Sequence, residues 1–292
     1  MPTLKEIKTR KNAVKSTQKI TKAMKMVAAS KFRKAQASVV STRPYASKMS
    51  ELLSHLARYS QSGADVSVNP LMQEREIKKR VIIVMSSDRG LCGAFNTNII
   101  KYTTKYLNDV GRDTPLIPIG KKVHDYFSKR NYNVFKSYVG FFSDLNITAS
   151  NEIVALLING YLENQFDSVE IIYNEFKSVM KQVLVKDQFL PFRKPESKQK
   201  GKHILIDYIY EPGARQILDE LIPKQLKIKF WKALLESNAS EQGARMTAME
   251  MATKNADDLL LSLELAYNRA RQEAITNELL EIVSGAEALK KG

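Results

Sequence analysis

The last quarter of the chain constrains the fold more than any other segment. From Lys224 to Ser284 the sequence contains no proline and a single glycine, Gly243. Residues that favour helices dominate this stretch. One helix over this range would be about 90 Å long, at about 1.5 Å per residue. That length exceeds the diameter of a globular domain of this mass, so we expect a helix that extends beyond any compact core.

The side chains of this segment repeat with alternating spacings of four and three residues, as in the seam of a coiled coil. The seam comprises Leu235, Ala239, Gln242, Met246, Met249, Thr253, Ala256, Leu260, Leu263, Tyr267, Ala270 and Ala274. After Ala274 the apolar stripe continues on a shifted face, through Ile275, Leu279, Ile282, Ala286 and Leu289. A helix gains most of its stability by burying one face, so a second long helix must pair with this one.

The partner helix is predicted at the other end of the chain. Residues 3–43 contain neither glycine nor proline, which predicts a helix of about 41 residues and about 60 Å. Its seam is thin and partly polar, with Ile7, Val14, Thr21, Ala28 and Ala35 spaced seven apart and Leu4, Met24 and Val39 nearby. We expect Pro44 to kink or interrupt the helix, before a helical stretch over 49–59 and a linker over 63–70. Helices at opposite chain ends would pair antiparallel.

The middle of the chain alternates short β-rich runs with helical patterns, which is typical of βαβ units. Core strands are expected over 81–85, 116–119, 134–139 and 169–173, edge strands over 183–190 and 204–210, and helices over 95–108, 121–130 and 147–165. A basic loop is expected over 193–202. The predicted fold class is α/β: a long antiparallel coiled coil of the terminal helices plus a Rossmann-like domain with a mainly parallel sheet. The predicted domains are 1–60, 75–212 and 213–292, the first pairing with the last.

Positive charge is concentrated in the first helix. The chain carries a net charge of +15, and its first 34 residues hold eleven basic side chains against one acidic residue, Glu6. This segment requires an acidic partner. Nucleic acid is an alternative partner because its phosphates attract such clusters, but no nucleic-acid reading motif is visible and the first aromatic residue is Phe32.

Several classes of protein are disfavoured by what the chain lacks. No apolar run approaches the length of a membrane span, and the N-terminus lacks the apolar core of a signal peptide, so we expect a cytoplasmic start. The single cysteine, Cys92, excludes an intrachain disulfide. His55, His124 and His203 show no metal-ligand spacing. We therefore assign no metal, no cofactor and no catalytic residue.

The turn that contains Cys92 permits a second alternative, a nucleotide-dependent α/β enzyme. Cys92 lies between Gly90 and Gly93 in an expected strand-to-helix turn, where enzymes place nucleophiles and phosphate-binding loops. However, no Gly-Lys-Ser/Thr or Gly-x-Gly-x-x-Gly pattern follows, and no histidine lies nearby to act as a base. We interpret Cys92 as a structural thiol.

Segments spread along the whole chain resemble the gamma subunit of the rotary (F-type) ATP synthase, bacterial type. They are Gln18-Lys-Ile-Thr-Lys-Ala-Met-Lys-Met-Val-Ala-Ala-Ser-Lys31, Arg43-Pro-Tyr45, Ser87-Asp-Arg-Gly-Leu-Cys-Gly93, Ser240-Glu-Gln-Gly-Ala-Arg-Met-Thr-Ala-Met249, and 267–286. The resemblance implies a non-catalytic rotor subunit in the central stalk of a proton-translocating enzyme. Such a subunit couples ion flow through the membrane sector to ATP synthesis or hydrolysis by rotation, and matters for assembly and regulation of the catalytic complex.

The resemblance also implies partners and a location. The coiled coil would enter a hexamer of alpha and beta subunits, while the Rossmann-like domain would lie beside the epsilon subunit and on the ring of c subunits. The chain would be peripheral at the cytoplasmic face of the bacterial inner membrane. The cysteine-bearing regulatory insertion of the chloroplast form is absent from this sequence.

Rotor–stator contacts are implied, through the same resemblance, at seven positions: Met24, Arg89, Cys92, Arg245, Arg271, Gln272 and Thr276. Each has an ordinary alternative. A methionine often fills a gap in a core, and exposed charges on a helix usually contribute little. Lys22, Lys25 and Lys31 around Met24 would ordinarily form a solvated face, and beside an acidic lever they would also supply attraction.

Overall fold

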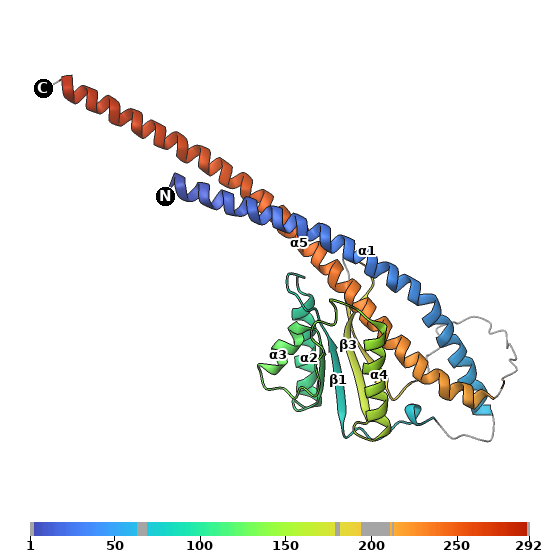
Figure 1. Ribbon diagram of the computed structural model, residues 1–292. Coiled ribbons are helices and arrows are strands. Elements are labelled where there is room, and N and C mark those ends of the chain that lie inside the picture. Colours follow the sequence, from blue (N-terminus) through green and yellow to red (C-terminus); the bar gives the residue numbers. More distant parts are fainter. Residues whose placement is uncertain (1–2, 63–68, 179–181, 194–210, 212, 291–292) are drawn as a thin grey trace. The chain divides into compact units, whose positions relative to one another are not determined.

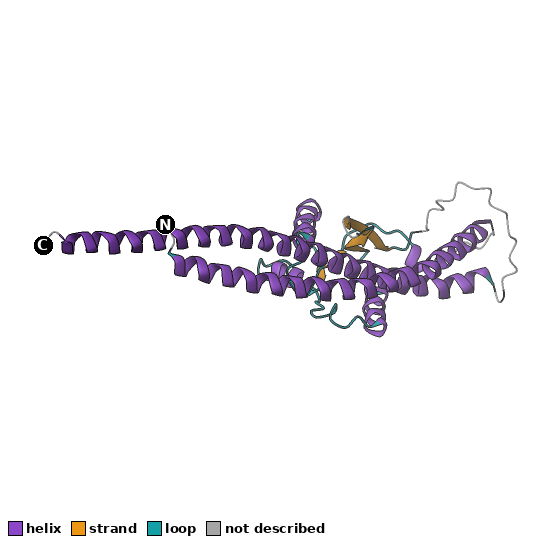
Figure 2. Cartoon of the chain, turned by 90° about the horizontal axis from the view of Figure 1, so that it is seen from above, coloured by secondary structure: helices purple, strands orange, loops and turns teal. Residues whose placement is uncertain are grey.

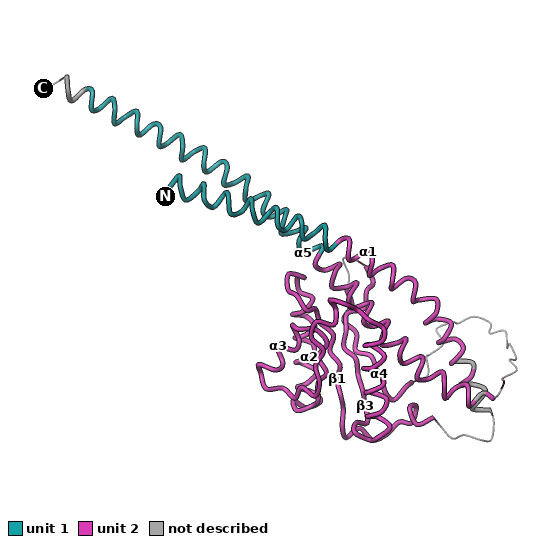
Figure 3. The backbone as a smooth tube through the Cα atoms, in the orientation of Figure 1, with its two compact units in different colours: residues 1–28, 246–292 teal, residues 29–245 magenta. Residues whose placement is uncertain are grey.

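The computed structural model describes residues 3–62, 69–178, 182–193, 211 and 213–290 of the 292-residue chain. The chain divides into two compact units (Figure 3). Residues 1–28 and 246–292 form the first, which we call the coil unit, and residues 29–245 form the second, the sheet unit. Among the described residues, strands occur only in the sheet unit (Figure 2).

Two long helices supply segments to both units. Helix α1 spans Leu4–Ser62, 59 residues, and helix α5 spans Ala214–Lys290, 77 residues. The prediction of two long terminal helices is confirmed, and both helices are longer than the sequence patterns suggested. Helix α5 also contains a proline, Pro223, within its first turns.

Of the two outcomes expected at Pro44, a kink or an interruption, the interruption is wrong, because α1 continues through it. Proline removes one backbone donor and crowds the preceding turn. Here Pro44 lies on the exposed face of the helix, and the residues after it bury Met49, Leu53 and Leu56 in the core of the sheet unit. That burial stabilises the helix beyond the proline and offsets the lost hydrogen bond.

The sheet has four strands in the order β2-β1-β3-β4. Strands β1 (Arg80–Met85), β2 (Leu116–Ile119) and β3 (Ser168–Phe176) are parallel, and β4 (Gln182–Leu190) is antiparallel to β3. The mainly parallel sheet and the edge position of 183–190 were both predicted. The other expected edge strand, 204–210, and nearly all of the expected loop over 193–202 lie outside the described residues.

The prediction of a core strand over 134–139 is wrong. This segment runs beside β2 but meets it only at two isolated bridges, Leu116 with Val134 and Ile119 with Tyr138. Leu116 donates a backbone hydrogen bond to Asn133, just before this segment, and Gly120 donates one to Tyr138, at 2.8 Å each. Pro118 lies between them and has no N–H to donate, so the ladder cannot continue. The fourth strand of the sheet is therefore β4.

Helices cover both faces of the sheet (Figure 1). Helices α2 (Phe95–Val110) and α3 (Lys121–Ser128) pack against the face that carries Ile82 and Val84. Helix α4 (Ile147–Leu162) and the first part of α5 pack against the opposite face, which carries Val81, Ile83 and Met85. Neighbouring residues of a strand point to opposite faces, so a strand that is apolar from Val81 to Met85, as β1 is, requires this double cover. A 3₁₀ helix over Pro70–Met72 precedes the domain.

Helices α1 and α5 also pack together inside the sheet unit. Phe32, Ala35 and Val39 of α1 form one buried cluster with Leu235 and Ala239 of α5 and with Phe176 of β3. The rings of Phe32 and Phe176 meet edge to face, with centroids 5.4 Å apart. Small side chains at Ala35 and Ala239 allow the two helices to approach closely.

In the coil unit the two helices run antiparallel, as predicted. Lys11 bonds to Glu264, Gln18 to Asp257, Thr21 to Thr253 and Lys25 to Glu250. The partner number falls as the α1 number rises, which is the signature of antiparallel pairing. The buried or half-buried seam continues along α5 as far as Ala274.

Candidate functional site

The seven positions expected to make rotor–stator contacts fall into both units. Arg89, Cys92 and Arg245 lie in the sheet unit, and the structure brings them together at one turn. Met24, Arg271, Gln272 and Thr276 lie in the coil unit. We call the first group, with Ser87, Asp88, Leu91 and Glu241, the turn cluster.

The thiol of Cys92 faces the interior of the sheet unit. The residue is 1% exposed and packs with Phe95 and Ala244. Asn96 donates a hydrogen bond to its Sγ at 3.1 Å, and Asn96 also accepts from the backbone N–H of Ser87 at 3.1 Å. Burial raises the pKa of the thiol, opposed by the hydrogen bond to Ser87 and by the charge of Arg245. A thiol in this setting is inert, as expected for a structural cysteine.

The carboxylate of Asp88 ties the turn to its neighbours. Its Oδ1 accepts the backbone N–H of Lys121 at 3.0 Å and of Gly140 at 2.8 Å, and its Oδ2 accepts that of Phe142 at 3.1 Å. Lys121 begins α3, where a negative charge is favourable. The sequence did not indicate this role for Asp88.

The tip of the turn is exposed and strained. Arg89 is exposed, and Leu91 is 63% exposed with a left-handed φ of 62°. That conformation costs a leucine about 1–2 kcal/mol. It persists only where surrounding contacts hold the backbone in place.

Arg245 supplies several of those contacts from α5. Its Nη2 donates to the carbonyl oxygens of Arg89, at 3.2 Å, and Gly90, at 3.4 Å. Its Nη1 donates to Glu241 Oε1 at 2.7 Å and to Gln242 Oε1 at 3.1 Å. Arg245 is 9% exposed, and Glu241 is 4% exposed. Burial raises the pKa of Glu241, and the guanidinium of Arg245 opposes that shift.

Met24 is half-buried in the coil unit, near a set of polar contacts between α1 and α5. Thr253 donates to Thr21 at 2.9 Å, and Lys25 pairs with Glu250 at 2.6 Å. Lys22 is exposed, as the solvated-face interpretation expected. Lys25 instead joins the helix pair, as does Lys11, which pairs with Glu264 at 2.8 Å. Lys11, Gln18 and Lys25 are seven residues apart, so the sequence already contained a signal that they share the face toward α5.

Beyond Ala274 the C-terminal end of α5 buries none of its described side chains. Arg271, Gln272 and Thr276 are exposed, and Thr276 bonds only to the carbonyl of Gln272, at 2.9 Å. The same stretch exposes large apolar side chains, namely Ile275, Leu279, Leu280, Ile282 and Val283. An exposed apolar stretch of this kind typically marks an interaction surface. We call residues 271–283 the helix tail.

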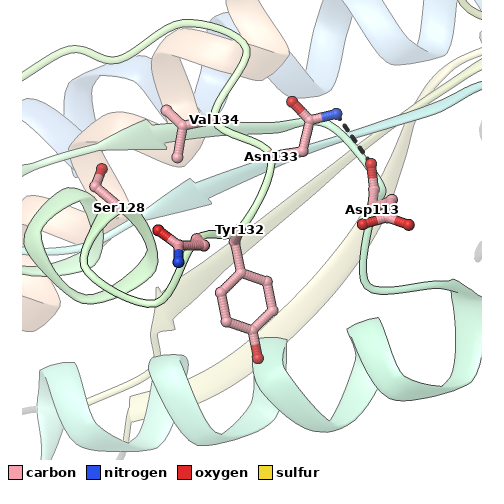
Figure 4. Close-up of a pocket in the computed structure, with 6 residues that line it drawn as sticks. Asp113, Ser128, Tyr132, Asn133 and Val134 are labelled. Carbon is pink, nitrogen blue, oxygen red and sulfur yellow. Dashed lines mark hydrogen bonds between the residues drawn. The ribbon is translucent and has the colours of Figure 1, made fainter.

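Two surface hollows among the described residues of the sheet unit are lined by none of the seven positions. One of about 560 Å³ is lined by Asp113, Ser128, Asn131, Tyr132, Asn133 and Val134 (Figure 4). Within it Asn133 donates to the backbone carbonyl of Asp113 at 3.0 Å. The second, of about 640 Å³, lies where β1 and β2 begin and includes Lys78, Lys79 and Arg80.

Among the described residues, no three His, Cys, Asp or Glu side chains converge as a metal site would require. No helix within the described ranges is long and apolar enough to cross a bilayer.

The chain matches the family described as ATP synthase over residues 3–289. It is 47% identical to the ATP synthase gamma chain of Chloroherpeton thalassium, across 100% of this chain and 99% of that protein. Identity to the ATP synthase gamma chain of Chlorobium phaeobacteroides (strain DSM 266) is 48%, across 99% of this chain and 100% of the relative.

Solved structures with a similar fold come from mitochondrial ATP synthases. A chain of the Tetrahymena thermophila central stalk and c-ring structure gives a TM-score of 0.59 at 26% identity, covering 80% of this chain and 99% of that one. A chain of the Euglena gracilis OSCP/F1/c-ring structure gives 0.67 at 20% identity, covering 98% and 94%, and this likeness concerns the fold alone. With the antiparallel terminal helices, the mainly parallel sheet and full-length identities near one half, this chain belongs to the ATP synthase gamma chain family.

Proposed function

We propose that this chain is the central-stalk rotor subunit of an F-type ATP synthase. It couples ion flow through the membrane sector to ATP synthesis or hydrolysis by rotating within the catalytic complex. The observation that carries the proposal is the antiparallel pairing of α1 and α5 in the coil unit, in a chain that matches the gamma chain family from end to end.

The coil unit has the physical properties of a shaft. Its seam is narrow, with Ile7, Thr21, Ala28, Met249 and Ala256 among the buried positions. Small residues bring the two helices close together, and bonds between them resist sliding. A pair of helices that presents different faces to surrounding subunits biases each of them toward a different state, and rotation exchanges those biases.

The partners are those that the resemblance to the gamma chain family implies, and the charge and exposed apolar residues of the chain suit them. The basic first helix attracts acidic segments of the beta subunits. The helix tail enters a sleeve formed by the alpha and beta subunits, where apolar contacts impose little preference for one angle. Arg271, Gln272 and Thr276 contact loops of the beta subunits that open and close with nucleotide state, and arginine and glutamine can form several hydrogen bonds there. The sheet unit lies on the c-subunit ring and beside the epsilon subunit.

The exposed tip of the turn cluster and Met24 are further contacts with the stator. Arg89 projects from the turn toward a carboxylate of a beta subunit. Cys92 and Arg245 are buried, so they contribute to this contact by holding the turn from inside. The terminal segments 1–60 and 213–292 act together as the shaft, and 75–212 acts as the foot domain. The subunit does no chemistry itself, and it is peripheral at the cytoplasmic face of the bacterial membrane through its complex.

Copurification tests this function directly. A tagged chain is expressed in its native cell, isolated in mild detergent and weighed as an intact assembly by mass spectrometry. We expect alpha and beta subunits with the chain, and coupled ATP hydrolysis from the assembly. Recovery of the chain alone would contradict the proposal. Recovery with nucleic acid, in a salt-sensitive complex, would favour the nucleic-acid alternative for the basic helix.

Calorimetry of the isolated chain with ATP, ADP or NAD tests the enzyme alternative. Because the Cys92 turn carries none of the phosphate-binding patterns, we expect no tight one-site binding. Tight binding at one site would favour a nucleotide-dependent enzyme and would count against the rotor.

A further inference from the structure

The backbone carbonyl of Arg89 is the point at which the turn cluster is tied together. Ser87 Oγ donates to it at 2.6 Å, Arg245 Nη2 donates at 3.2 Å, and Cys92 Sγ lies 3.9 Å away. A carbonyl oxygen has two lone pairs and can accept more than one hydrogen bond. The three donors around the Arg89 oxygen therefore hold this peptide group from several sides. One residue further on, Gly90 offers its carbonyl to the same guanidinium at 3.4 Å.

The guanidinium of Arg245 is itself held in place. Glu241, one helical turn earlier on α5, accepts from Nη1 at 2.7 Å, and Gln242 accepts at 3.1 Å. Both acceptors are buried. One edge of the planar group is therefore anchored to α5, while the other edge reaches the turn. Nη1 of the rigid, planar guanidinium bonds to α5, and Nη2 bonds to the turn.

The residue that follows the tied carbonyls is the exposed Leu91, with its left-handed φ of 62°. The chain would relax from this conformation if its neighbours were free to move. A large apolar side chain is thus held outward, away from the core of its own unit.

We propose that Arg245 is a positioning residue, which binds α5 to the Arg89–Gly90 backbone and so presents Leu91 in one fixed direction to the subunits that surround the rotor. This inference rests on the proposed rotor function and adds to it. Arg245 acts through the turn, Glu241 holds Arg245, and Leu91 makes the contact.

Hydrogen exchange in the assembled ATP synthase tests the first half of this proposal. The variants are Arg245→Gln, Arg245→Lys and Glu241→Gln, and the control is Lys224→Gln, which removes an exposed pair with Glu220 on the same helix. We expect exchange of the amides of 88–92 to rise roughly tenfold to a hundredfold in Arg245→Gln, the factor that charge-assisted hydrogen bonds supply. Arg245→Lys should restore only part of the protection from exchange, because an ammonium group cannot bond to Glu241 and to the carbonyl groups of the turn at the same time.

Exchange in β1 and β3 should stay unchanged in all four variants, which separates loosening of the turn from general unfolding. Unchanged exchange over 88–92 in Arg245→Gln would overturn the proposal. A rise that Lys224→Gln matches would overturn it as well.

A double-mutant cycle tests the second half. Proton pumping per ATP hydrolysed is measured for Leu91→Ala, Arg245→Gln and the double variant in the assembled enzyme. If Arg245 acts through Leu91, the double variant loses no more coupling than the worse single variant. Independent, multiplying losses would overturn the proposal, as would normal coupling in both single variants. Failure of the unchanged chain to assemble with alpha and beta subunits would instead refute the rotor function itself.

Discussion

The coil unit and the sheet unit are stabilised in different ways. Most of the sheet unit's core residues are fully buried between two layers of helices, with Ile82, Ile83 and Val84 at 0% exposure. The coil unit buries single side chains along one seam, both small and large, flanked by polar bonds between α1 and α5. Packing density therefore decides stability in the sheet unit, while the coil unit depends on many small contributions. The predictions below test this contrast.

The largest expected effect is a backbone clash in the sheet unit. A Cβ at Gly120 would lie 2.2 Å from the carbonyl oxygen of Ser86, and φ there is +100°. Gly120→Ala should lower the free energy of unfolding by about 3 kcal/mol or more. The control is Gly140→Ala, with φ at +82° and no atom near the added Cβ, which should lose about 1 kcal/mol. Urea unfolding followed by the fluorescence of Trp231, the only tryptophan, measures both. Equal losses would show that the clash is relieved.

A smaller effect is expected when the narrow seam of the coil unit is overfilled. Ala28 is 1% exposed, so Ala28→Leu should destabilise the helix pair by about 1–3 kcal/mol. Ala23 is exposed on the same helix, and Ala23→Leu controls for helix propensity. Thermal melting followed by circular dichroism at 222 nm reads out helix loss. Retained stability in Ala28→Leu would mean that the seam has room to spare.

The two units should respond to pH with opposite signs. Burial raises the pKa of Glu236, opposed by Lys232, whereas hydrogen bonding to Lys11 lowers the pKa of Glu264. Between the ordinary value of 4.5 and its raised folded pKa, Glu236 keeps a proton that the unfolded chain has released. Stability of the sheet unit therefore falls as pH rises through this window. The contribution of Glu264 is present above pH 4.5 and is lost as pH falls through its lowered pKa.

The stability of the sheet unit should fall less steeply with rising pH in Glu236→Gln. The part of the slope that this substitution removes is at most about 1.4 kcal/mol per pH unit. Trp231 fluorescence in urea series between about pH 4.5 and 7.5 measures the slope. A slope that survives the substitution would have to come from another buried carboxyl group, such as Glu241.

The smallest expected effect concerns one exposed pair in the coil unit. Lys25→Gln removes the bond to Glu250, whose side chain is 57% exposed, and should cost about 0–1 kcal/mol. Added salt should shrink the difference between the variant and the parent chain, because it screens exposed charges. A loss comparable to that of Ala28→Leu, measured by the same melting experiment, would show that polar bonds dominate the coil unit.

The pairing of the long helices and the type of sheet could be predicted from the sequence, because both depend on the periodicity of apolar residues. The seven-residue spacing of Ile7, Val14, Thr21 and Ala28 and the seam of α5 predicted an antiparallel pair. Short apolar runs predicted a mainly parallel sheet. Local errors arose where tertiary packing outweighed propensity. Burial of Met49 and Leu53 carries α1 through Pro44, and the missing N–H of Pro118 prevents a strand over 134–139.

The sequence by itself determined the helix pairing and the sheet, because repeating apolar spacing fixes which faces must be buried. It also supplied the residues of the turn cluster, through resemblance, but not their arrangement. Only the tertiary structure decided that Cys92 faces inward, that Leu91 faces outward and that Arg245 reaches the carbonyl groups of the turn. Arg245 and Arg89 are separated by 156 positions in the sequence. Contacts at such separations depend on how the sheet and α5 pack, which no local pattern records.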